Sequence, residues 1–230
     1  MKCEFTFKHL KEIYTKALDL DYKIYTLKEY FTSNINYKKI LINRVDIDLD
    51  IFKAKKIAEI FNDLGIHGTF FVRLHAQEYN LLSPKSKKIL DYIISTGNEV
   101  GLHHECVDMG KCWKQDPNVI MKVNLDLLEK ILGMKVCGVS AHNQSTGYNN
   151  LDIWKNTNPN NFGLIYEAYD KQLWNKCVYV SDSLRRWKIY KNGKLVDNDY
   201  KCLCEHLEDN YKLLYVLIHP INQSERYKEK

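Results

Sequence analysis

Short apolar runs alternate with longer amphipathic segments along almost the whole of this sequence. Such alternation is typical of a β/α protein whose strands are mostly parallel, because each parallel pair needs a crossover connection that is usually a helix. The pattern predicts seven strands, at 40–48, 68–73, 99–103, 136–142, 162–167, 178–182 and 213–219. We therefore expect an α/β fold built around one central sheet.

Helix ends are marked by residues that agree with this alternation. The predicted helices cover 7–18, 51–64, 84–95 and 117–132, and a further one opens at Thr26. Ser83 and Asp116 stand at N-cap positions, and Gly65 and Gly133 follow the last turns of their helices. Because no linker or repeat interrupts the chain, we predict a single domain over 1–230, with 1–38 as a helical extension packed on it.

Composition excludes several classes of protein. With 45% hydrophobic residues in 230, the chain can bury a sizeable core, but no window approaches the roughly 20 apolar residues of a membrane span. The N-terminal segment also lacks a signal-peptide pattern, so we predict a cytoplasmic protein without stable membrane insertion. The net charge of +5 comes without a basic, aromatic-rich stripe, which argues against nucleic acid as a partner. The oligomeric state is left open.

Cysteine usage points to free thiols. The sequence contains seven cysteines and no C-x-x-C pair. An odd number without paired spacing favours neither a disulfide scaffold nor a structural zinc ribbon.

Each predicted strand begins apolar and finishes on a polar or ionisable residue. These residues are Asp46 and Asp48, Arg73, His103, His142, Glu167, Asp182 and His219. In β/α proteins the loops at the carboxyl ends of the strands converge, and chemistry collects there. The sequence therefore predicts a functional site at this edge of the sheet.

Two of these strand ends carry metal-ligand types. The two-residue period of a strand places Arg44, Asp46 and Asp48 on one face, with the two carboxylates about 7 Å apart. Close carboxylates persist where a cation neutralises them or where one acts as a proton acceptor. His103, His104 and Glu105 add imidazole and carboxylate groups, which suit zinc and other divalent ions. We expect Asp48 and His103, on neighbouring strand ends, to form half of a metal site.

Further groups suited to catalysis and sugar binding follow the later strands. His142 and His219 each end an apolar run, and histidine readily exchanges protons near neutral pH. The segment 179–187 adds a carboxylate, hydroxyl groups, guanidinium groups and an indole, a combination that suits sugar rings.

The ordered set of motifs resembles the polysaccharide deacetylase superfamily, the proteins with the NodB-type domain of carbohydrate esterase family 4. The motifs are R-x-D-I-D at 44–48, L-G-I-H-G-T-F-F-V at 64–72, G-N-E-V-G-L-H at 97–103, S-D-S at 181–183 with Trp187, and L-I-H-P at 217–220. The resemblance covers roughly 41–220, and it is strongest to a cytosolic branch associated with surface-polysaccharide gene clusters.

This resemblance implies a distorted seven-stranded (β/α) barrel and metal-dependent removal of an N-acetyl or related acyl group from an amino sugar or glycan. By motif, Asp46 would be the general base and His219 the general acid, while Asp48 and His103 would bind a divalent metal, with zinc as the first choice. The family's second metal histidine would fall on Val107. The third ligand is therefore expected from Glu105, His104 or His142.

The remaining predictions concern the substrate, which we expect to be a small molecule or a glycan. The expected substrate contacts are Arg44, Arg73, His104, Asp182, Ser183, Arg185 and Trp187. Two alternatives stay open. One is a deformylase or amidohydrolase acting on a small nitrogenous metabolite, and the other is a saccharide-binding module of the same fold that has lost its metal.

Overall fold

The computed structural model describes residues 3–143 and 146–226. The helices are α1 (Phe7–Asp19), α2 (Leu27–Thr32), α3 (Ile51–Leu64), α4 (Pro84–Ser95), α5 (Cys106–Trp113), α6 (Pro117–Leu132), α7 (Lys171–Trp174) and α8 (Leu203–Glu208), with 3-10 turns η1 (Asn150–Lys155), η2 (Pro159–Phe162) and η3 (Pro220–Asn222). The strands are β1 (Lys23–Tyr25), β2 (Ile40–Ile47), β3 (Thr69–Val72), β4 (Glu99–His104), β5 (Gly138–Ala141), β6 (Tyr166–Glu167), β7 (Val178–Ser181), β8 (Lys188–Lys191), β9 (Lys194–Leu195) and β10 (Leu213–Ile218).

Among the described residues, one sheet contains ten strands, in the order β6-β5-β4-β3-β2-β10-β7-β8-β9, and β1 pairs with the first half of β2. Every pairing is parallel except those within the β7-β8-β9 meander. The predicted α/β class with a mostly parallel sheet is confirmed. Each of the seven predicted ranges contains a strand, but in 162–167 only Tyr166–Glu167 forms one, because Phe162 ends the 3-10 turn η2. Asn192 and Gly193, both at positive φ (50° and 73°), form the tight turn between β8 and β9.

The expected seven-stranded barrel is not closed by hydrogen bonds. Over the described ranges, no ladder joins β6 to β7, so these strands border a gap in an otherwise continuous sheet. β6 is only two residues long, and the chain then enters α7 before reaching β7. Side chains cover the gap instead: Tyr215 donates a hydrogen bond to Ala168 O (3.0 Å), and the rings of Tyr169 and Tyr179 pack edge to face.

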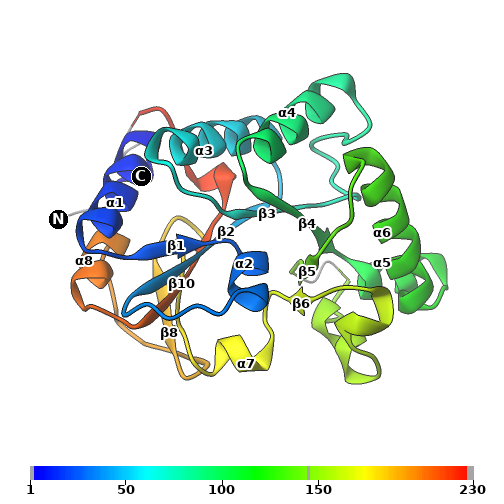
Figure 1. Ribbon diagram of the computed structural model, residues 1–230. Coiled ribbons are helices and arrows are strands. Elements are labelled where there is room, and N and C mark those ends of the chain that lie inside the picture. The colour runs from blue at the N-terminus through cyan, green and yellow to red at the C-terminus, as the bar shows by residue number, and fades with distance from the viewer. Residues whose placement is uncertain (1–2, 144–145, 227–230) are drawn as a thin grey trace.

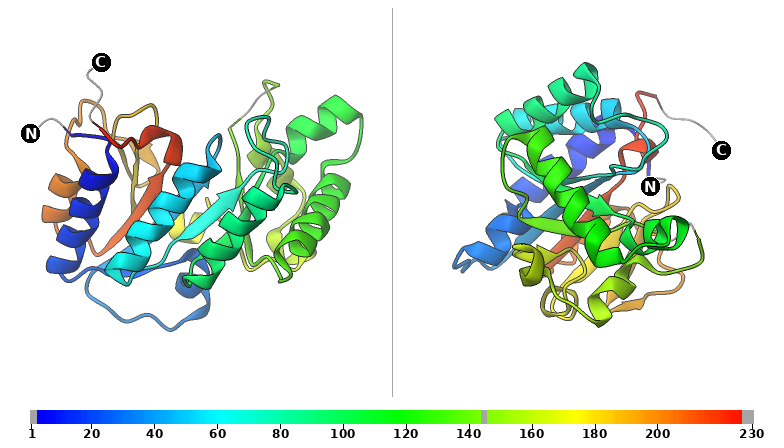
Figure 2. Two further views of the ribbon diagram at one scale, coloured as in Figure 1. Left: turned by 90° about the horizontal axis from the view of Figure 1, so that it is seen from above. Right: turned by 90° about the vertical axis from the view of Figure 1, so that its right-hand side faces the viewer.

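The sheet has a helix-covered face and an inner face. Helices α1, α3, α4 and α6 follow one another along the first face (Figure 1), and the two views of Figure 2 show the same layer from other directions. Val45, Ile47 and Phe70 belong to the large core beneath these helices, which we call the outer core. Tyr215 and Phe71 belong to a second, smaller core on the inner face.

Helix α2 covers the amino-terminal ends of the central strands. Its first residue, Leu27, is buried in the inner core, and the Leu27 N–H donates to Thr69 Oγ1 (2.8 Å) at the start of β3. The next N–H, of Lys28, donates to Glu99 Oε2 (3.0 Å) at the start of β4. Because α2 lies at this end, the opposite, carboxyl ends of β2 to β5 remain available to form a pocket.

Two glycines make room for aromatic rings on the inner face. A Cβ atom at Gly138 would lie 2.0 Å from the Tyr166 ring, and one at Gly101 would lie 2.5 Å from Phe71. Glycine at these positions therefore allows the inner core to fill with aromatic side chains beneath the strand ends.

The segment before α1 is fixed to the segment after β10. Phe7 N–H donates to Ser224 O (3.0 Å), and Ser224 N–H donates to Phe5 O (3.1 Å). Helix α1 also packs against α3 and α8. Within residues 3–143 and 146–226, no helix is long and apolar enough to cross a membrane.

Candidate active site

A pocket of about 610 Å³ lies at the carboxyl ends of β2, β4, β5 and β10. Its lining includes Asp46, Asp48, His103, His142 and His219. These five residues were all singled out by their positions at predicted strand ends. The parallel sheet explains their convergence, because it brings the ends of separate strands to one edge.

The alternation along β2 separates the charged from the apolar side chains. Val45 and Ile47 are wholly buried in the outer core, whereas Arg44 and Asp46 point to the inner side. Asp48 follows one residue beyond the strand, and Asp50 then caps α3 by accepting a hydrogen bond from Lys53 N–H (3.0 Å). The short loop between strand and helix holds Asp48 at the pocket.

The imidazole of His103 faces two carboxylates. Its Nε2 lies 3.2 Å from Asp48 Oδ1 and 3.3 Å from Asp46 Oδ2. Its Nδ1 lies 3.0 Å from Ser140 O, and since a carbonyl oxygen only accepts, Nδ1 carries the proton. In neutral His103 the Nε2 lone pair would thus point at two anions, so this arrangement requires a proton or a metal cation at Nε2.

We expected Asp48 and His103 to follow neighbouring strands, but β3 lies between β2 and β4. Burial acts to lower the pKa of His103, but the charges of Asp46 and Asp48 outweigh it and raise the pKa. The side chains meet even though their strands do not.

His142 completes a group of three possible ligands. One ligand atom from each of Asp48, His103 and His142 lies within 4.8 Å of the other two. Glu105 Oε1 lies 3.1 Å from His142 Nδ1 and orients that ring, leaving Nε2 on the side of Asp48 (3.9 Å from Oδ1). Such a carboxylate behind a histidine is the usual outer support of a metal ligand. Glu105, which was expected among the direct ligands, therefore lies behind the candidate ligand His142.

Arg73 braces Glu105 and the loop of Asp48. Its guanidinium donates to both carboxylate oxygens of Glu105 (2.8 and 3.2 Å) and to Asp48 O (2.9 Å). Burial acts to raise the pKa of Glu105, but hydrogen bonds from His142 and Arg73 lower it to about 2. Arg73 does not line the pocket, so the substrate contact expected of it is not supported.

Arg44 lies beneath Asp46 and is wholly buried. Its guanidinium donates to Asp46 Oδ1 (2.8 Å) and Oδ2 (2.6 Å), and also to Ser140 Oγ and Tyr169 OH. Burial would raise the pKa of Asp46, but the charges of Arg44 and His103 outweigh it and lower the pKa. Arg44 was expected to contact substrate, but its guanidinium is fully enclosed and does not line the pocket.

His219 is held by a buried aspartate. Asp182 Oδ1 lies 2.6 Å from His219 Nδ1 and accepts from the His219 backbone N–H (3.0 Å), while Oδ2 accepts from Gln223 Nε2 (3.2 Å). Burial acts to lower the pKa of His219, but Asp182 raises it to about 9. Asp182 was expected to contact substrate, but it is fully buried and absent from the pocket lining, and its carboxylate holds His219.

The described residues fit a divalent cation. Asp48 Oδ1 is buried and accepts no well-aligned hydrogen bond from the described residues, although His103 Nε2 lies 3.2 Å from it. One carboxylate oxygen and two imidazole nitrogens around this point are ligands that zinc and similar first-row ions prefer. Three protein ligands leave further positions for water or substrate, as in catalytic zinc sites.

His104 is on the other face of its strand. Because side chains alternate along β4, His103 points inward and His104 outward, where its ring packs edge to face against Trp154. Burial lowers the pKa of His104 to about 3. His104 was expected to contact substrate or to serve as a ligand, but its ring lies outside the pocket lining and outside the group of Asp48, His103 and His142.

The segment after β7 contributes fewer side chains to the pocket lining than expected. Ser183 lines the pocket, and its Oγ lies 2.7 Å from Ser181 Oγ. Arg185 is not part of the lining, and Trp187 is buried in the outer core, where its ring stacks on Phe5. The structure therefore places Trp187 away from the pocket at which its sugar contact was expected.

An aromatic wall that the sequence reasoning missed stands in its place. It consists of Tyr169, Trp174, Tyr179 and Tyr190, which all line the pocket. Tyr179 and Tyr190 are direct partners across the antiparallel β7-β8 pair, and the Trp174 ring lies 4.8 Å from that of Tyr179. Part of the signal was present: Tyr179 shares the face of Ser181, and the Asn192-Gly193 turn marks β8, which contains Tyr190, as one arm of a hairpin with β9.

Comparisons with known proteins give structural similarity only. No family model matches the chain, and no curated protein matches it. Among solved structures, the Streptococcus pyogenes deacetylase PplD in complex with acetate is 18% identical, with a TM-score of 0.44, and the match covers 56% of this chain and 59% of that chain.

Two further structures are similar to a comparable degree. IcaB from Ammonifex degensii is 12% identical, with a TM-score of 0.44, over 65% of this chain and 71% of that chain. The catalytic domain of the peptidoglycan N-acetylglucosamine deacetylase from Eubacterium rectale is 15% identical, with a TM-score of 0.42, over 83% and 80%. At these identities and TM-scores, the similarity by itself assigns no activity to this chain.

Proposed function

We propose that this chain is a metal-dependent hydrolase of the polysaccharide deacetylase superfamily, which removes an N-acetyl or related acyl group from an amino sugar or glycan intermediate. We further propose that it acts in the cytoplasm during assembly of a surface polysaccharide. The observation that carries the proposal is His103 Nε2, which faces two carboxylates while its Nδ1 is fixed by a backbone carbonyl.

Asp48, His103 and His142 would hold the divalent cation, with zinc as the first choice. When bound, such a cation supplies Lewis-acid polarisation of the acyl carbonyl and a lowered pKa for water. Glu105 and Arg73 keep His142 and the Asp48 loop in place for binding.

Asp46 has the properties of a general base. Arg44 keeps its carboxylate ionised from behind, and Asp46 Oδ2 lies 3.3 Å from His103 Nε2, at the edge of the ligand group. An ionised carboxylate here can accept a proton from the water that attacks the acyl carbon.

His219 has the properties of a general acid. Its Nε2 lies 3.8 Å from Asp48 Oδ2, while Asp182 accepts the hydrogen bond from its Nδ1 and favours the protonated ring. A protonated His219 can donate to the nitrogen that leaves as the amide bond breaks. Base and acid are thereby supplied by separate strands, β2 and the end of β10.

The aromatic wall supports a sugar as the substrate. Tyr179, Trp174 and Tyr190 offer ring faces on which the C–H face of a pyranose can pack. Ser183 and Lys188, at the same pocket, can hydrogen-bond the hydroxyl groups at the edge of the ring.

The test compares Asp48→Asn with Asp50→Asn, the same chemical change two residues apart. Asparagine serves as an N-cap as well as aspartate, so Asp50→Asn should keep α3 and full activity. We expect metal-loaded wild-type protein to release acetate from N-acetylglucosamine derivatives, and both chelation and Asp48→Asn to abolish this. Acetate release by Asp48→Asn at the wild-type rate would contradict the proposal. Cleavage of acyclic formamides only, or sugar binding without hydrolysis, would replace it with one of the two alternatives.

A further inference from the structure

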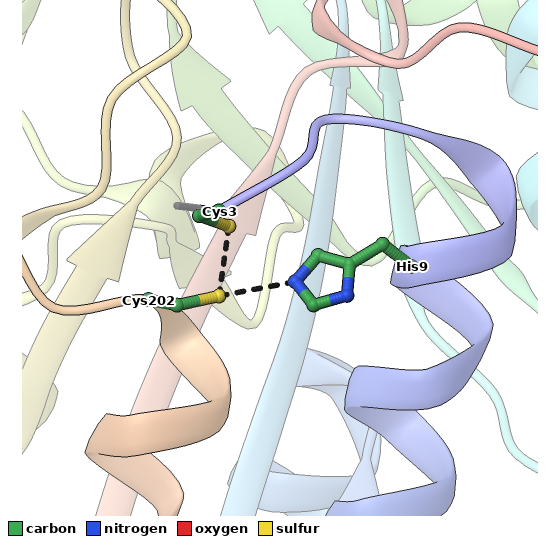
Figure 3. A group of neighbouring side chains, drawn as sticks. All are labelled: Cys3, His9 and Cys202. Carbon is green, nitrogen blue, oxygen red and sulfur yellow. Dashed lines mark hydrogen bonds between the residues drawn. The ribbon is translucent and has the colours of Figure 1, made fainter. Parts of the chain in front are cut away.

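A second cluster of metal-ligand side chains lies outside the pocket. It consists of Cys3, His9 and Cys202, whose ligand atoms lie within 4.8 Å of one another (Figure 3). Cys3 precedes α1, His9 is in the first turn of α1, and Cys202 is the residue before α8. None of the three lines the pocket described above. The fold thus brings together two thiols that are 199 positions apart in sequence. No C-x-x-C spacing could therefore indicate this cluster.

The sulfur atoms approach each other and the imidazole closely. Cys3 Sγ lies 2.7 Å from Cys202 Sγ, and His9 Nε2 lies 3.2 Å from Cys202 Sγ. The sulfur–sulfur distance is longer than the roughly 2.05 Å of a disulfide bond. Both cysteines are free thiols, with Cys202 buried and Cys3 partly buried.

The tautomer of His9 is set by a carboxylate on the far side of the ring. Glu12 Oε2 lies 3.1 Å from His9 Nδ1, and an ionised carboxylate only accepts, so Nδ1 carries the proton. The Nε2 lone pair consequently faces Cys202 Sγ, and Figure 3 shows the ring directed at this sulfur. A carboxylate–histidine pair of this kind is typical of the outer support of zinc ligands.

A hydrogen-bond donor serves the other sulfur. Trp187 Nε1 donates to Cys3 Sγ (3.0 Å), and an indole N–H is a donor only. Hydrogen bonding to the charged form favours a thiolate, which is the form that binds metal. A disulfide between Cys3 and Cys202 would make no use of His9, Glu12 or this indole.

We propose that Cys3, His9 and Cys202 bind a zinc ion that fastens the segment before α1 to the start of α8. Two thiolates and one imidazole are ligands that zinc prefers. With Zn–S distances of about 2.3 Å in tetrahedral geometry, the two sulfurs would stand about 3.8 Å apart, so they must separate by about 1 Å from their present positions. Cys3 lies in a segment without helix or strand structure, so it can make this movement.

This site is separate from the proposed active site and can be tested without an activity assay. In Asp48→Asn protein, where the pocket ligands are disrupted, we expect one equivalent of zinc to remain bound. Replacing that zinc with Co²⁺ should produce the near-ultraviolet charge-transfer absorption of a thiolate–cobalt bond, which the oxygen and nitrogen ligands of the pocket cannot give.

The test variant is Cys202→Ala and its matched control is Cys112→Ala, both made in the Asp48→Asn protein. Cys112 is exposed on α5, so its replacement should keep the zinc and the absorption, whereas Cys202→Ala should lose both. His9→Gln provides a second variant on a less buried position and should weaken zinc binding at least tenfold by chelator competition. Zinc content and absorption unchanged in Cys202→Ala and His9→Gln would overturn the proposal. So would a Cys3–Cys202 disulfide-linked peptide in an unreduced digest of the freshly purified protein.

Discussion

Replacing Arg44 by methionine tests how Asp46 is kept ionised inside the fold. The two side chains are 0% and 2% exposed, and both terminal oxygens of Asp46 accept from the guanidinium, at 2.8 and 2.6 Å. Methionine keeps much of the length of arginine without its charge. In the variant, His103 Nε2, 3.3 Å from Asp46 Oδ2, is the cationic partner that remains within ion-pair distance in the described chain.

The expected loss of stability follows from the carboxylate charge of Asp46, which Arg44→Met would leave buried without its main partner. Removing one partner of a buried ion pair typically costs about 3–5 kcal/mol. Because His103 still compensates part of the charge of Asp46, we expect the lower end, about 3 kcal/mol. Asp46→Asn in the same chain removes the uncompensated charge. The double variant should therefore be more stable than Arg44→Met by at least about 1 kcal/mol.

The pKa of Asp46 determines how the stability cost of Arg44→Met changes with pH. Arg44 and His103 lower this pKa in the wild type against the effect of burial, so the stability that the pair contributes is present above the unfolded-state pKa and is lost as pH falls through the folded-state pKa. Without Arg44 the pKa should rise. The cost of Arg44→Met should then be largest at neutral pH and should shrink as the carboxyl becomes protonated.

The assay is urea unfolding of wild type, both single variants and the double variant, in chelator, at neutral and mildly acidic pH. The four free energies of unfolding close a double-mutant cycle. The reasoning is refuted if the double variant is no more stable than Arg44→Met at neutral pH, since Arg44 would then not be what keeps Asp46 charged.

Three further predictions concern the pocket. Glu105→Gln should weaken metal affinity about 10- to 100-fold in chelator competition, because the ligand ring behind which it lies loses its anionic support. Trp174→Ala should raise KM for N-acyl sugars more than it lowers kcat, whereas exposed Trp113→Ala should change neither. For His219, with a pKa of about 9, kcat/KM should fall as pH rises through that value, and Asp182→Asn should move this limb to lower pH. An unmoved limb in Asp182→Asn would contradict the role of that aspartate.

Much of the fold was predictable because its signals are local. Strand periodicity and helix caps identified the seven strands and the long helices, including the Gly65 end of α3. Two short helices lacked such signals. Helix α5 follows β4 directly and has no side-chain hydrogen bond at its N-cap, Glu105, while α8 has Cys202 at that position. The open edge between β6 and β7 depends on how far the sheet curves, which no local pattern encodes.

The strand-end rule found the residues of the pocket floor better than those of its wall. It identified Asp46, Asp48 and His219 correctly as neighbours, but it did not distinguish groups that face the pocket from groups that support them. Asp182 is such a support: it stands at a strand end, yet its hydrogen bonds go to His219. Trp187 lies away from the pocket for another reason. Leu184 and the next residue adopt positive φ (62° and 55°), and after this reversal the indole lies in the outer core.

Val107, where the resemblance implied a second metal histidine, shows why spacing along the chain is a weaker guide than position in the sheet. β4 ends at His104 and α5 begins at Cys106, so Val107 already lies in the first turn of that helix, 8% exposed within the outer core. A histidine there would have to leave this core to reach His103. The neighbouring strand β5 offers a shorter route, because it pairs with β4 in register and delivers His142 directly after its last residue. The ring centroids of His103 and His142 consequently lie 5.0 Å apart. A third ligand is therefore best sought at the carboxyl end of an adjacent strand, where the parallel sheet itself supplies the proximity that a helical spacing would otherwise provide.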